Sequence, residues 1–210
     1  MKAFDVVVVG KGNAANCAAL AARDMGASVA MLEAATPDES GGNSRFAGGV
    51  MRFAYNNVDD LRKLIDITDE EAKTTDWESN TQEQFYDDLY RVTNFRTDPE
   101  LSEVLITQSL DAMVWLRSQG VRFVPNYRAQ SAVVNGQRRF FGRMPLEISG
   151  GGPGLVQSAT DTAVKKGVEI FYETRAISLM YDGKCVSGVH AKCKGELIDF
   201  KAKSIVLACG

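Results

Sequence analysis

Three small residues in one short segment, Gly10, Gly12 and Ala15, carry the clearest chemical signal in this chain of 210 residues. They form a G-x-G-x-x-A pattern directly after an apolar, β-branched run and before an alanine-rich segment. In a strand–turn–helix unit, the first glycine allows a tight turn and the second lets the backbone approach a pyrophosphate. The third small residue permits close contact between helix and strand. The N–H groups at the start of the helix, where Asn13 and Ala14 stand, then face the phosphates. The segment therefore predicts a dinucleotide-binding turn.

An acidic residue stands where such a unit needs one. Glu33 follows the second apolar run, residues 28–32, at the position where a carboxylate accepts hydrogen bonds from the adenosine ribose. We place Glu33 and its neighbour Ala34 among the candidate cofactor-binding residues. Because a carboxylate here disfavours a 2′-phosphate, NADP is the least suitable dinucleotide. A turn of the same shape that binds no nucleotide is the alternative.

A second glycine-rich segment, residues 40–49, favours FAD over NAD. An NAD domain usually continues with a plain helix here, whereas this chain reads SGGNSRFAGG. Glycines let the backbone approach a ligand closely, and Asn43 and Ser44 can form hydrogen bonds with it. A flexible Gly/Ser linker is the alternative, but Arg45, Phe46 and Met51 are not typical of linkers.

Glu33 and the string GGNSRFAGGVMRFAY, residues 41–55, resemble the fumarate reductase/succinate dehydrogenase flavoprotein superfamily, and the string is most similar to its tricarballylate dehydrogenase-like members. The resemblance spans the whole chain but only the front part of a typical member. It implies contacts with FAD by Asn43, Ser44, Gly48 and Gly49 along the pyrophosphate and flavin, by Ala176 at the adenine, and by a turn containing Ala208 and Gly210. Membrane-bound succinate dehydrogenases hold the flavin covalently on a histidine that would fall near Gly42. The only histidine in this sequence is His190, so we expect FAD to be bound non-covalently.

The order of the apolar runs predicts an α/β fold. We expect a Rossmann-like FAD-binding domain of the glutathione-reductase type, with a central parallel sheet and an inserted antiparallel β-meander. The expected strands are residues 4–9, 28–32, 121–124, 139–141, 168–174 and 204–208, with meander strands at 177–181, 185–191 and 197–201. The expected helices are residues 15–24, a helix that starts after Thr81, and residues 98–120 and 155–166. Helical spacing predicts a buried stripe on the third of these helices, formed by Leu101, Val104, Leu105, Ala112 and Leu116.

Arginines in two places could bind a carboxylate substrate. Arg143 belongs, with Arg138 and Arg139, to a basic cluster before the glycine-rich residues 149–154, and the resemblance implies that this stretch lies near the flavin and the substrate. A guanidinium group pairs with a carboxylate in bidentate fashion, so Arg45 and Arg143 are substrate candidates. A surface patch that pairs with nearby acids is the alternative. We assign no catalytic residue, because the family's proton donor belongs to a capping domain, and we expect His190 to be structural.

The bulk composition argues against several kinds of partner. A net charge of −3 and a pI near 5.3 disfavour nucleic acid, whose phosphates need a basic surface. No apolar run approaches the roughly 20 residues of a membrane-spanning helix. The four cysteines show no metal-ligand spacing, and isolated cysteines in an acidic chain indicate the reducing cytoplasm.

The resemblance implies an FAD-dependent dehydrogenase or reductase of a small (poly)carboxylate. Such an enzyme transfers a hydride to or from flavin N5 and needs an electron-transfer partner or acceptor. We interpret residues 1–210 as an incomplete FAD-binding domain, without the capping (substrate) domain and the C-terminal FAD segment, and expect this piece alone to be inactive. A ketosteroid-type flavin dehydrogenase and a non-catalytic nucleotide-binding fragment are the alternatives.

Overall fold

A computed structural model describes residues 2–210, which form two compact units. The first unit comprises the chain up to Ala47 together with Gly150–Gly210, and the second comprises Gly48–Ser149. Among residues 2–210, no helix combines the length and the apolar character needed to cross a membrane.

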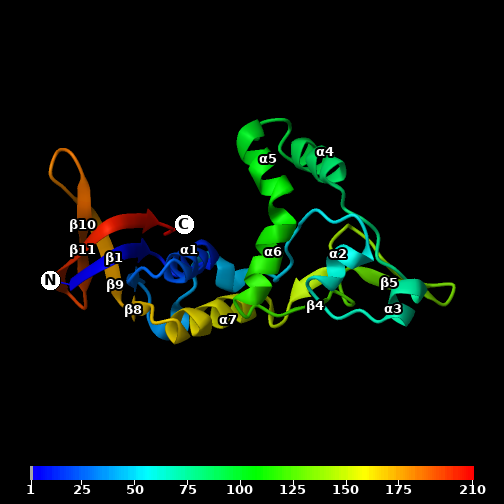
Figure 1. Cartoon of the computed structure of the whole chain (residues 1–210), viewed down its shortest axis with the longest axis horizontal. Coiled ribbons are helices and arrows are strands. Elements are labelled where there is room, and N and C mark those ends of the chain that lie inside the picture. Colours follow the sequence, from blue (N-terminus) through cyan, green and yellow to red (C-terminus); the bar gives the residue numbers. More distant parts are fainter. Residues whose placement is uncertain (1) are drawn as a thin grey trace. The chain divides into compact units, whose positions relative to one another are not determined.

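A six-stranded mixed sheet forms the centre of the first unit (Figure 1). The strands lie in the order β8-β2-β1-β11-β10-β9. Their bounds are β1 Lys2–Val9, β2 Val29–Leu32, β8 Glu169–Phe171, β9 Thr174–Tyr181, β10 Val186–Cys193 and β11 Glu196–Leu207. The first four strands in this order pair in parallel, and β11, β10 and β9 pair antiparallel. This arrangement confirms the predicted α/β fold with a parallel sheet and a meander.

Strand β11 corrects one prediction. The two strands expected at residues 197–201 and 204–208 are a single strand, whose first half pairs with β10 and whose residues 200–207 pair with β1. Lys201 and Lys203 are exposed while Ala202 between them is buried, so the alternation continues through a stretch that we interpreted as a gap. The end of the strand is also less buried than expected, since Leu207 is exposed.

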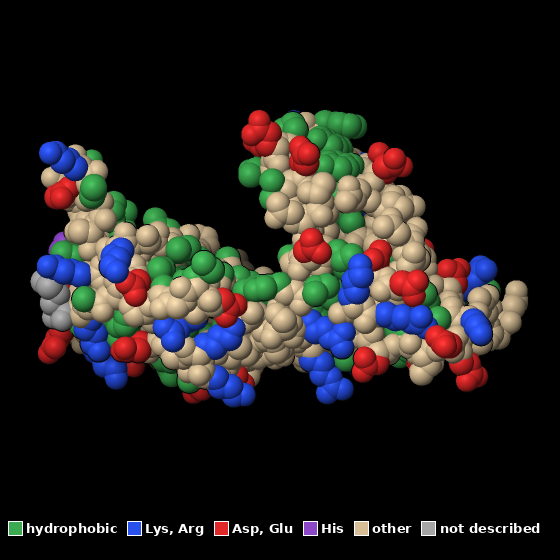
Figure 2. Space-filling view, in the orientation of Figure 1, with side chains coloured by type: hydrophobic (Ala, Val, Ile, Leu, Met, Phe, Trp, Pro, Cys, Tyr) green, Lys and Arg blue, Asp and Glu red, His purple; other side chains and the backbone are tan. Residues whose placement is uncertain are grey.

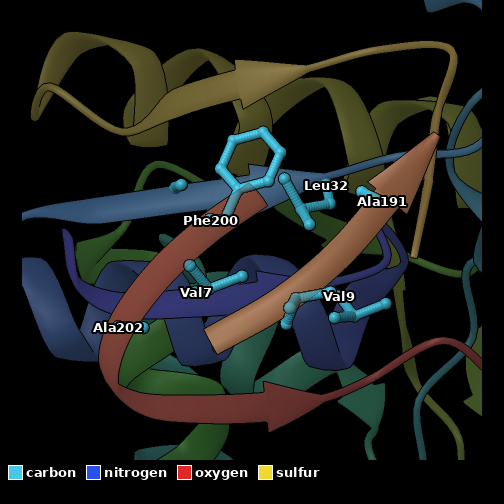
Figure 3. Packing of buried hydrophobic residues seen from close by; sticks show 8 residues of the cluster. Val7, Val9, Leu32, Ala191, Phe200 and Ala202 are labelled. Atoms are coloured by element: carbon cyan, nitrogen blue, oxygen red, sulfur yellow. The ribbon is translucent and has the colours of Figure 1, made fainter. Parts of the chain in front are cut away.

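One apolar cluster of the first unit is formed by side chains of β1, β2, β10 and β11 (Figure 3). Phe200 is fully buried at its centre, and the ring of Phe171 packs against it edge to face. Helix α1, Asn13–Asp24, packs on β1 and β2, and helix α7, Gly151–Lys165, packs on α1. Two short 3-10 helices, η1 at Pro37–Glu39 and η2 at Gly42–Phe46, follow β2.

Several predicted boundaries in the first unit were wrong by a few residues. Helix α1 begins at Asn13 instead of Ala15, and α7 begins at Gly151 instead of Leu155. Strand β8 is shorter than the predicted range 168–174. The predictions that Gly26 ends α1 and that Gly167 ends α7 are confirmed. Both glycines have the positive φ that is typical of a residue just after a helix.

The second unit is mainly helical, with short strands. Its elements are α2 Val58–Arg62, α3 Asp69–Thr74, β3 Thr75–Asp76, α4 Gln82–Val92, α5 Pro99–Thr107, α6 Ser109–Ser118, β4 Phe123–Pro125, β5 Ser131–Val134, β6 Gln137–Phe140 and β7 Leu146–Ile148. The predicted start of α4 is confirmed, because Thr81 caps it and exchanges hydrogen bonds with Gln84. Strands β4 and β6 match the two short strands predicted at 121–124 and 139–141 to within two residues. They pair with β7 and with β5, respectively, and β6 also pairs with β3.

The single helix predicted at residues 98–120 is two helices, α5 and α6, which meet at Gln108. The predicted stripe was wrong as well, because Leu101, Val104 and Leu105 are exposed, and Figure 2 shows hydrophobic side chains at the surface over α4 and α5. The buried stripe consists of Ser102, Ile106, Ser109, Met113 and Leu116. Its two serines hide it from a pattern based on apolar residues, although both hydroxyls form hydrogen bonds with the protein.

Candidate functional site

A cavity of about 810 Å³ lies at the carboxyl ends of β1, β2 and β11 in the first unit. Open α/β sheets bind ligands outside the carboxyl ends of their parallel strands. Most of the cofactor-binding residues predicted from the sequence line this cavity: Gly10, Gly12, Asn13, Ala14, Glu33, Ala34, Asn43, Ser44, Ala176, Ala208 and Gly210. Folding thus brings together three stretches that are distant in the sequence, within residues 9–44, 174–189 and 207–210.

Gly10 joins β1 to the turn, and its backbone conformation and the residue that follows β11 require it to be a glycine. Its φ of +108° is unfavourable for any side chain. A Cβ atom there would lie 2.3 Å from the carbonyl oxygen of Ala208, just beyond β11. The Gly10 N–H also donates to the Leu32 carbonyl at 2.8 Å. The tight turn predicted from the sequence is present, and the Ala208 carbonyl, just beyond β11, leaves no room for a Cβ at Gly10.

The start of α1 is tied to the second glycine-rich segment. Gly12 caps the helix, and the N–H of Asn13 donates to the Ser44 hydroxyl at 2.9 Å. Because this hydroxyl oxygen acts as an acceptor, its own hydrogen can point elsewhere as a donor. Gly12 and Ser44 therefore place backbone and hydroxyl groups side by side on the cavity wall.

Helix α7 packs against η2, which belongs to the second glycine-rich segment. A Cβ atom on Gly152 would lie 2.2 Å from the Ser44 carbonyl oxygen and 2.6 Å from that of Ala47. The Gly152 N–H donates to the Ala47 carbonyl at 2.9 Å. The glycines that we interpreted as a turn before the helix thus form its first turn, where they allow the backbone of α7 to rest on η2.

Glu33 lies at the end of β2 and is 9% exposed. Its Oε1 accepts a hydrogen bond from the Ala35 N–H at 2.8 Å. The backbone of Glu33 also forms two hydrogen bonds. Its N–H donates to the Phe171 carbonyl, and its carbonyl accepts from the Thr174 N–H. The side chain is therefore oriented by the protein, and only one of its two carboxylate oxygens is used in this hydrogen bond.

Lys11 lines the cavity but is not among the residues predicted from the sequence. It stands between the two turn glycines and is only 5% exposed. Burial lowers the pKa of its ammonium group, and the charges of Glu33 and Asp161 oppose that effect. A long cationic residue among glycines and alanines was the signal that could have drawn attention to it.

Five predicted residues do not line the cavity. Ala15 is fully buried in α1, where its small side chain allows close packing, and Arg45 is half-buried, with its guanidinium donating to the Asp38 carbonyl. Gly48 and Gly49 belong to the second unit, as does Arg143.

The basic cluster of the second unit pairs with nearby acids. Arg143 donates to Asp88 at 2.9 Å and Arg139 lies 3.7 Å from Asp76. These contacts agree with the alternative interpretation of this cluster. Among residues 2–210, no group of three or more His, Cys, Asp or Glu side chains is arranged to hold a metal ion. His190 pairs with Asp199 across two neighbouring strands, with 2.7 Å between Nδ1 and Oδ1.

Comparison with known proteins places the chain among flavoproteins. The family described as FAD binding domain matches residues 5–210. A fumarate reductase (cytochrome) from Shewanella frigidimarina is 31% identical over 98% of this chain and 33% of its own length. The chain therefore spans about a third of this curated relative.

Solved structures agree with this result. A flavocytochrome c3 fumarate reductase in an open conformation superposes with a TM-score of 0.71 and 25% identity, over 98% of this chain and 33% of the other. A 3-ketosteroid-Δ4-(5α)-dehydrogenase from Rhodococcus jostii RHA1 gives a TM-score of 0.74 at 22% identity, over 98% and 45% of the two chains, and this shows a shared fold. The expected kinship with fumarate reductase flavoproteins is confirmed, while the finer resemblance to tricarballylate dehydrogenases stays a prediction.

Proposed function

The chain belongs to the FAD binding domain family, and from this premise we propose that its cavity binds the ADP half of FAD non-covalently, as part of an oxidoreductase that acts on a small carboxylate. FAD is the cofactor of this family. The observation that carries the proposal is the convergence of the glycine turn, Ser44 and Glu33 on one cavity at the carboxyl ends of parallel strands. We also propose that both units belong to one FAD-binding domain, since the family match runs through both.

The residues of the cavity fit the chemical groups of an ADP moiety. The first turn of α1 supplies the Ala14 N–H and the positive end of the helix dipole to the pyrophosphate, while the Asn13 N–H is already bonded to Ser44 and orients its hydroxyl. Ser44 can donate its hydroxyl hydrogen to a phosphate oxygen, because its oxygen already accepts from Asn13. The carboxylate of Glu33 accepts hydrogen bonds from the ribose hydroxyls with the oxygen that Ala35 leaves available.

Two further sets of residues complete the proposed cofactor contacts. Asn43, Ala34 and Ala176 lie on the wall of the same cavity and are assigned to the pyrophosphate and adenosine. Ala208 and Gly210 line it after β11. We assign Gly48 and Gly49 to the flavin side on the strength of the resemblance alone.

Bound flavin accepts or donates a hydride, and the protein supplies orientation and electrostatics. The named activity of the fumarate reductase relative favours a small carboxylate with a C–C bond that is oxidised or reduced, and an electron donor or acceptor as partner. Arg45 and Arg143 stay candidates for binding the substrate carboxylate. Arg143 would use the guanidinium N–H groups that Asp88 leaves available.

A ketosteroid-type dehydrogenase is the second candidate, because that enzyme shares the fold. A substrate panel with an artificial electron acceptor separates the two candidates. We expect turnover of fumarate, succinate or tricarballylate by the protein as it occurs in the cell. Oxidation of a 3-ketosteroid, with none of these acids converted, would favour the second candidate. Turnover by residues 1–210 alone would contradict the expectation that this piece is inactive.

FAD titration of the purified chain tests the site directly. Glu33→Gln is expected to weaken FAD binding by roughly ten- to a hundredfold, because it removes a charged hydrogen-bond acceptor. Glu196→Gln makes the same change of charge at an exposed position of β11 and serves as the control. Equal affinity of Glu33→Gln and the unmodified protein would reject the site. After acid precipitation we expect the yellow colour in the supernatant, and colour in the pellet would contradict non-covalent binding.

A further inference from the structure

Asn16 is a polar residue on the buried face of helix α1. The buried residues of this helix are Ala15, Asn16, Ala19 and Leu20, and the exposed fraction of Asn16 is 0%. Asparagine is a weak helix former, and burial of an amide group is unfavourable unless hydrogen bonds satisfy it. The hydrogen bonds of the Asn16 side chain must therefore offset the cost of placing it there.

The Asn16 amide group forms hydrogen bonds with the backbone of the glycine turn. Its Nδ2 donates to the carbonyl oxygens of Lys11 and Gly12, at 3.1 Å in each case. Its Oδ1 accepts from the Thr160 hydroxyl of α7 at 3.4 Å. Because two carbonyl oxygens can face only a donor, the NH₂ group and not the amide oxygen lies toward the turn. Asn16 thus links α7 to the two residues that precede α1.

These bonds also determine where the N–H groups of the turn point. Among residues 2–210 no peptide bond is cis, and in a planar trans peptide the C=O and N–H groups point in opposite directions. The Lys11 carbonyl shares its peptide plane with the Gly12 N–H, so its bond to the buried Asn16 directs that N–H away from the interior of α1. No group among residues 2–210 accepts a hydrogen bond from this N–H, and Gly12 lines the cavity.

The Gly12 carbonyl is restrained in the same way. It accepts from the backbone N–H of Asn16 at 3.0 Å as well as from the side chain. It shares its peptide plane with the Asn13 N–H, which donates to the Ser44 hydroxyl at 2.9 Å. The orientation of the hydroxyl that is expected to bind a phosphate therefore also depends on this peptide unit.

We propose that Asn16 is a positioning residue, which holds the Lys11 and Gly12 carbonyls inward and so presents the Gly12 N–H to the phosphates of the nucleotide. This inference rests on the proposed binding of an ADP moiety in the cavity. A carbonyl oxygen turned toward the phosphates would repel them, whereas an N–H group attracts them. The backbone of a glycine is intrinsically flexible, so the orientation of its peptide units needs such a restraint. Asn16 acts through the turn and does not line the cavity itself.

Calorimetric titration with ADP and with adenosine tests this inference. Asn16→Leu keeps a side chain of similar size and removes the donor. We expect it to weaken ADP binding by about tenfold, the effect of one charge-assisted hydrogen bond, and adenosine binding by less than about twofold, because adenosine has no phosphates. Asn80→Leu is the matched control, since Asn80 is also 0% exposed and its Nδ2 donates to the Phe53 carbonyl of the second unit. Neither affinity should change in this control.

Nuclear magnetic resonance of the amide protons gives a second readout, which a loss of stability alone would not change. In the unmodified protein, ADP is expected to shift the Gly12 amide proton downfield, as a hydrogen bond to a phosphate oxygen would, and adenosine is not. In Asn16→Leu saturated with ADP, this downfield shift should be lost.

Three outcomes would overturn the proposal. Equal losses of ADP and adenosine affinity in Asn16→Leu would show that Asn16 only stabilises the fold, as would an equal loss of ADP affinity in Asn80→Leu. An unchanged ADP affinity in Asn16→Leu would show that the turn does not need these bonds. Failure of the unmodified protein to bind ADP would instead reject the proposed function of the cavity, so the two failures are distinguishable. If thermal unfolding shows that Asn16→Leu does not fold, Asn16→Ala, which also lacks the donor and favours a helix, takes its place.

Discussion

At the scale of single residues, the carboxylate of Asp88 forms ion pairs with three arginines of the second unit. Arg52 and Arg143 both pair with its Oδ2, and Arg91 pairs with its Oδ1 at 2.9 Å. The hydrogen bond from Arg91, followed by that from Arg52, lowers the pKa of Asp88 to about 2, although burial acts in the opposite direction. Arg143 has a φ of +58°, and its backbone N–H donates to Glu78. Asp88 and Glu78 thus hold this loop residue at its side chain and its backbone.

Asp88→Asn is expected to lower the free energy of unfolding by about 2 kcal/mol at pH 7, as the depressed pKa of Asp88 implies. A carboxyl group whose pKa is lower in the folded state stabilises the fold above its unfolded-state pKa, near 4. This contribution is lost as the pH falls from about 4 to about 2. Urea unfolding at a series of pH values measures the free energy of unfolding of the unmodified protein and of Asp88→Asn. The difference between these two free energies should become smaller as the pH falls from about 4 to about 2. The exposed neighbour Asp87, changed to Asn, is the control, and a difference independent of pH would contradict the explanation.

At the scale of elements, the junction of α5 and α6 depends on one buried hydroxyl. Ser109 donates to the Ile106 carbonyl at 2.8 Å and accepts from the Ala54 N–H at 2.8 Å. It therefore joins the turn at Gln108 to a neighbouring segment that is distant in sequence. Ala54 and Ile106 also belong to the same apolar cluster as Phe85, which ties α4 to this junction.

Ser109→Ala is expected to cost about 2 kcal/mol of stability, because the buried N–H of Ala54 loses its partner. Ser118 offers a matched control at the other end of α6. Its hydroxyl makes the same kind of bond to a carbonyl three residues earlier, but it is exposed. Chemical denaturation of both variants is the measurement. Equal losses of stability in Ser109→Ala and Ser118→Ala would show that the buried hydrogen bond to Ala54 contributes nothing to the free energy of unfolding.

At the scale of the whole molecule, β11 joins the meander and the parallel strands of the first unit in one apolar cluster. The strand pairs with β10 of the meander and with β1 of the parallel sheet, and Phe200 stands where both pairings overlap. Figure 3 shows its ring among the side chains of both parts of the sheet. The meander and the parallel strands are thus expected to unfold together.

Phe200→Ala should lower the stability of the first unit by about 3–5 kcal/mol, the usual cost of removing a fully buried aromatic ring. Leu197→Ala, on the same strand but 78% exposed, should cost less than about 0.5 kcal/mol. Denaturation followed by hydrogen exchange on β1 and β10 checks both the size of the loss and its extent. Loss of protection in β10 alone would contradict a shared core.

The features of this protein that depend on residues close together along the chain could be predicted from the sequence alone. The turn at Gly10 and Gly12 and the acid at Glu33 were sufficient to predict a dinucleotide site. The second glycine-rich segment and the family resemblance then favoured FAD, because all of these residues lie close together within the first 55 positions. Alternation with a period of two was sufficient to predict the meander, because it reports which face of each strand is buried.

Tertiary structure decided the features that depend on partners distant in sequence. Only the fold places the Ala208 carbonyl over Gly10 and the backbone of Ser44 against Gly152. Only the fold brings Lys11 to Tyr172, and only the fold buries Ser109 against Ala54. The physical reason is the same in each case. Which atoms fill the space beside a residue depends on how separate segments pack, and no local pattern of polarity or small residues records that packing.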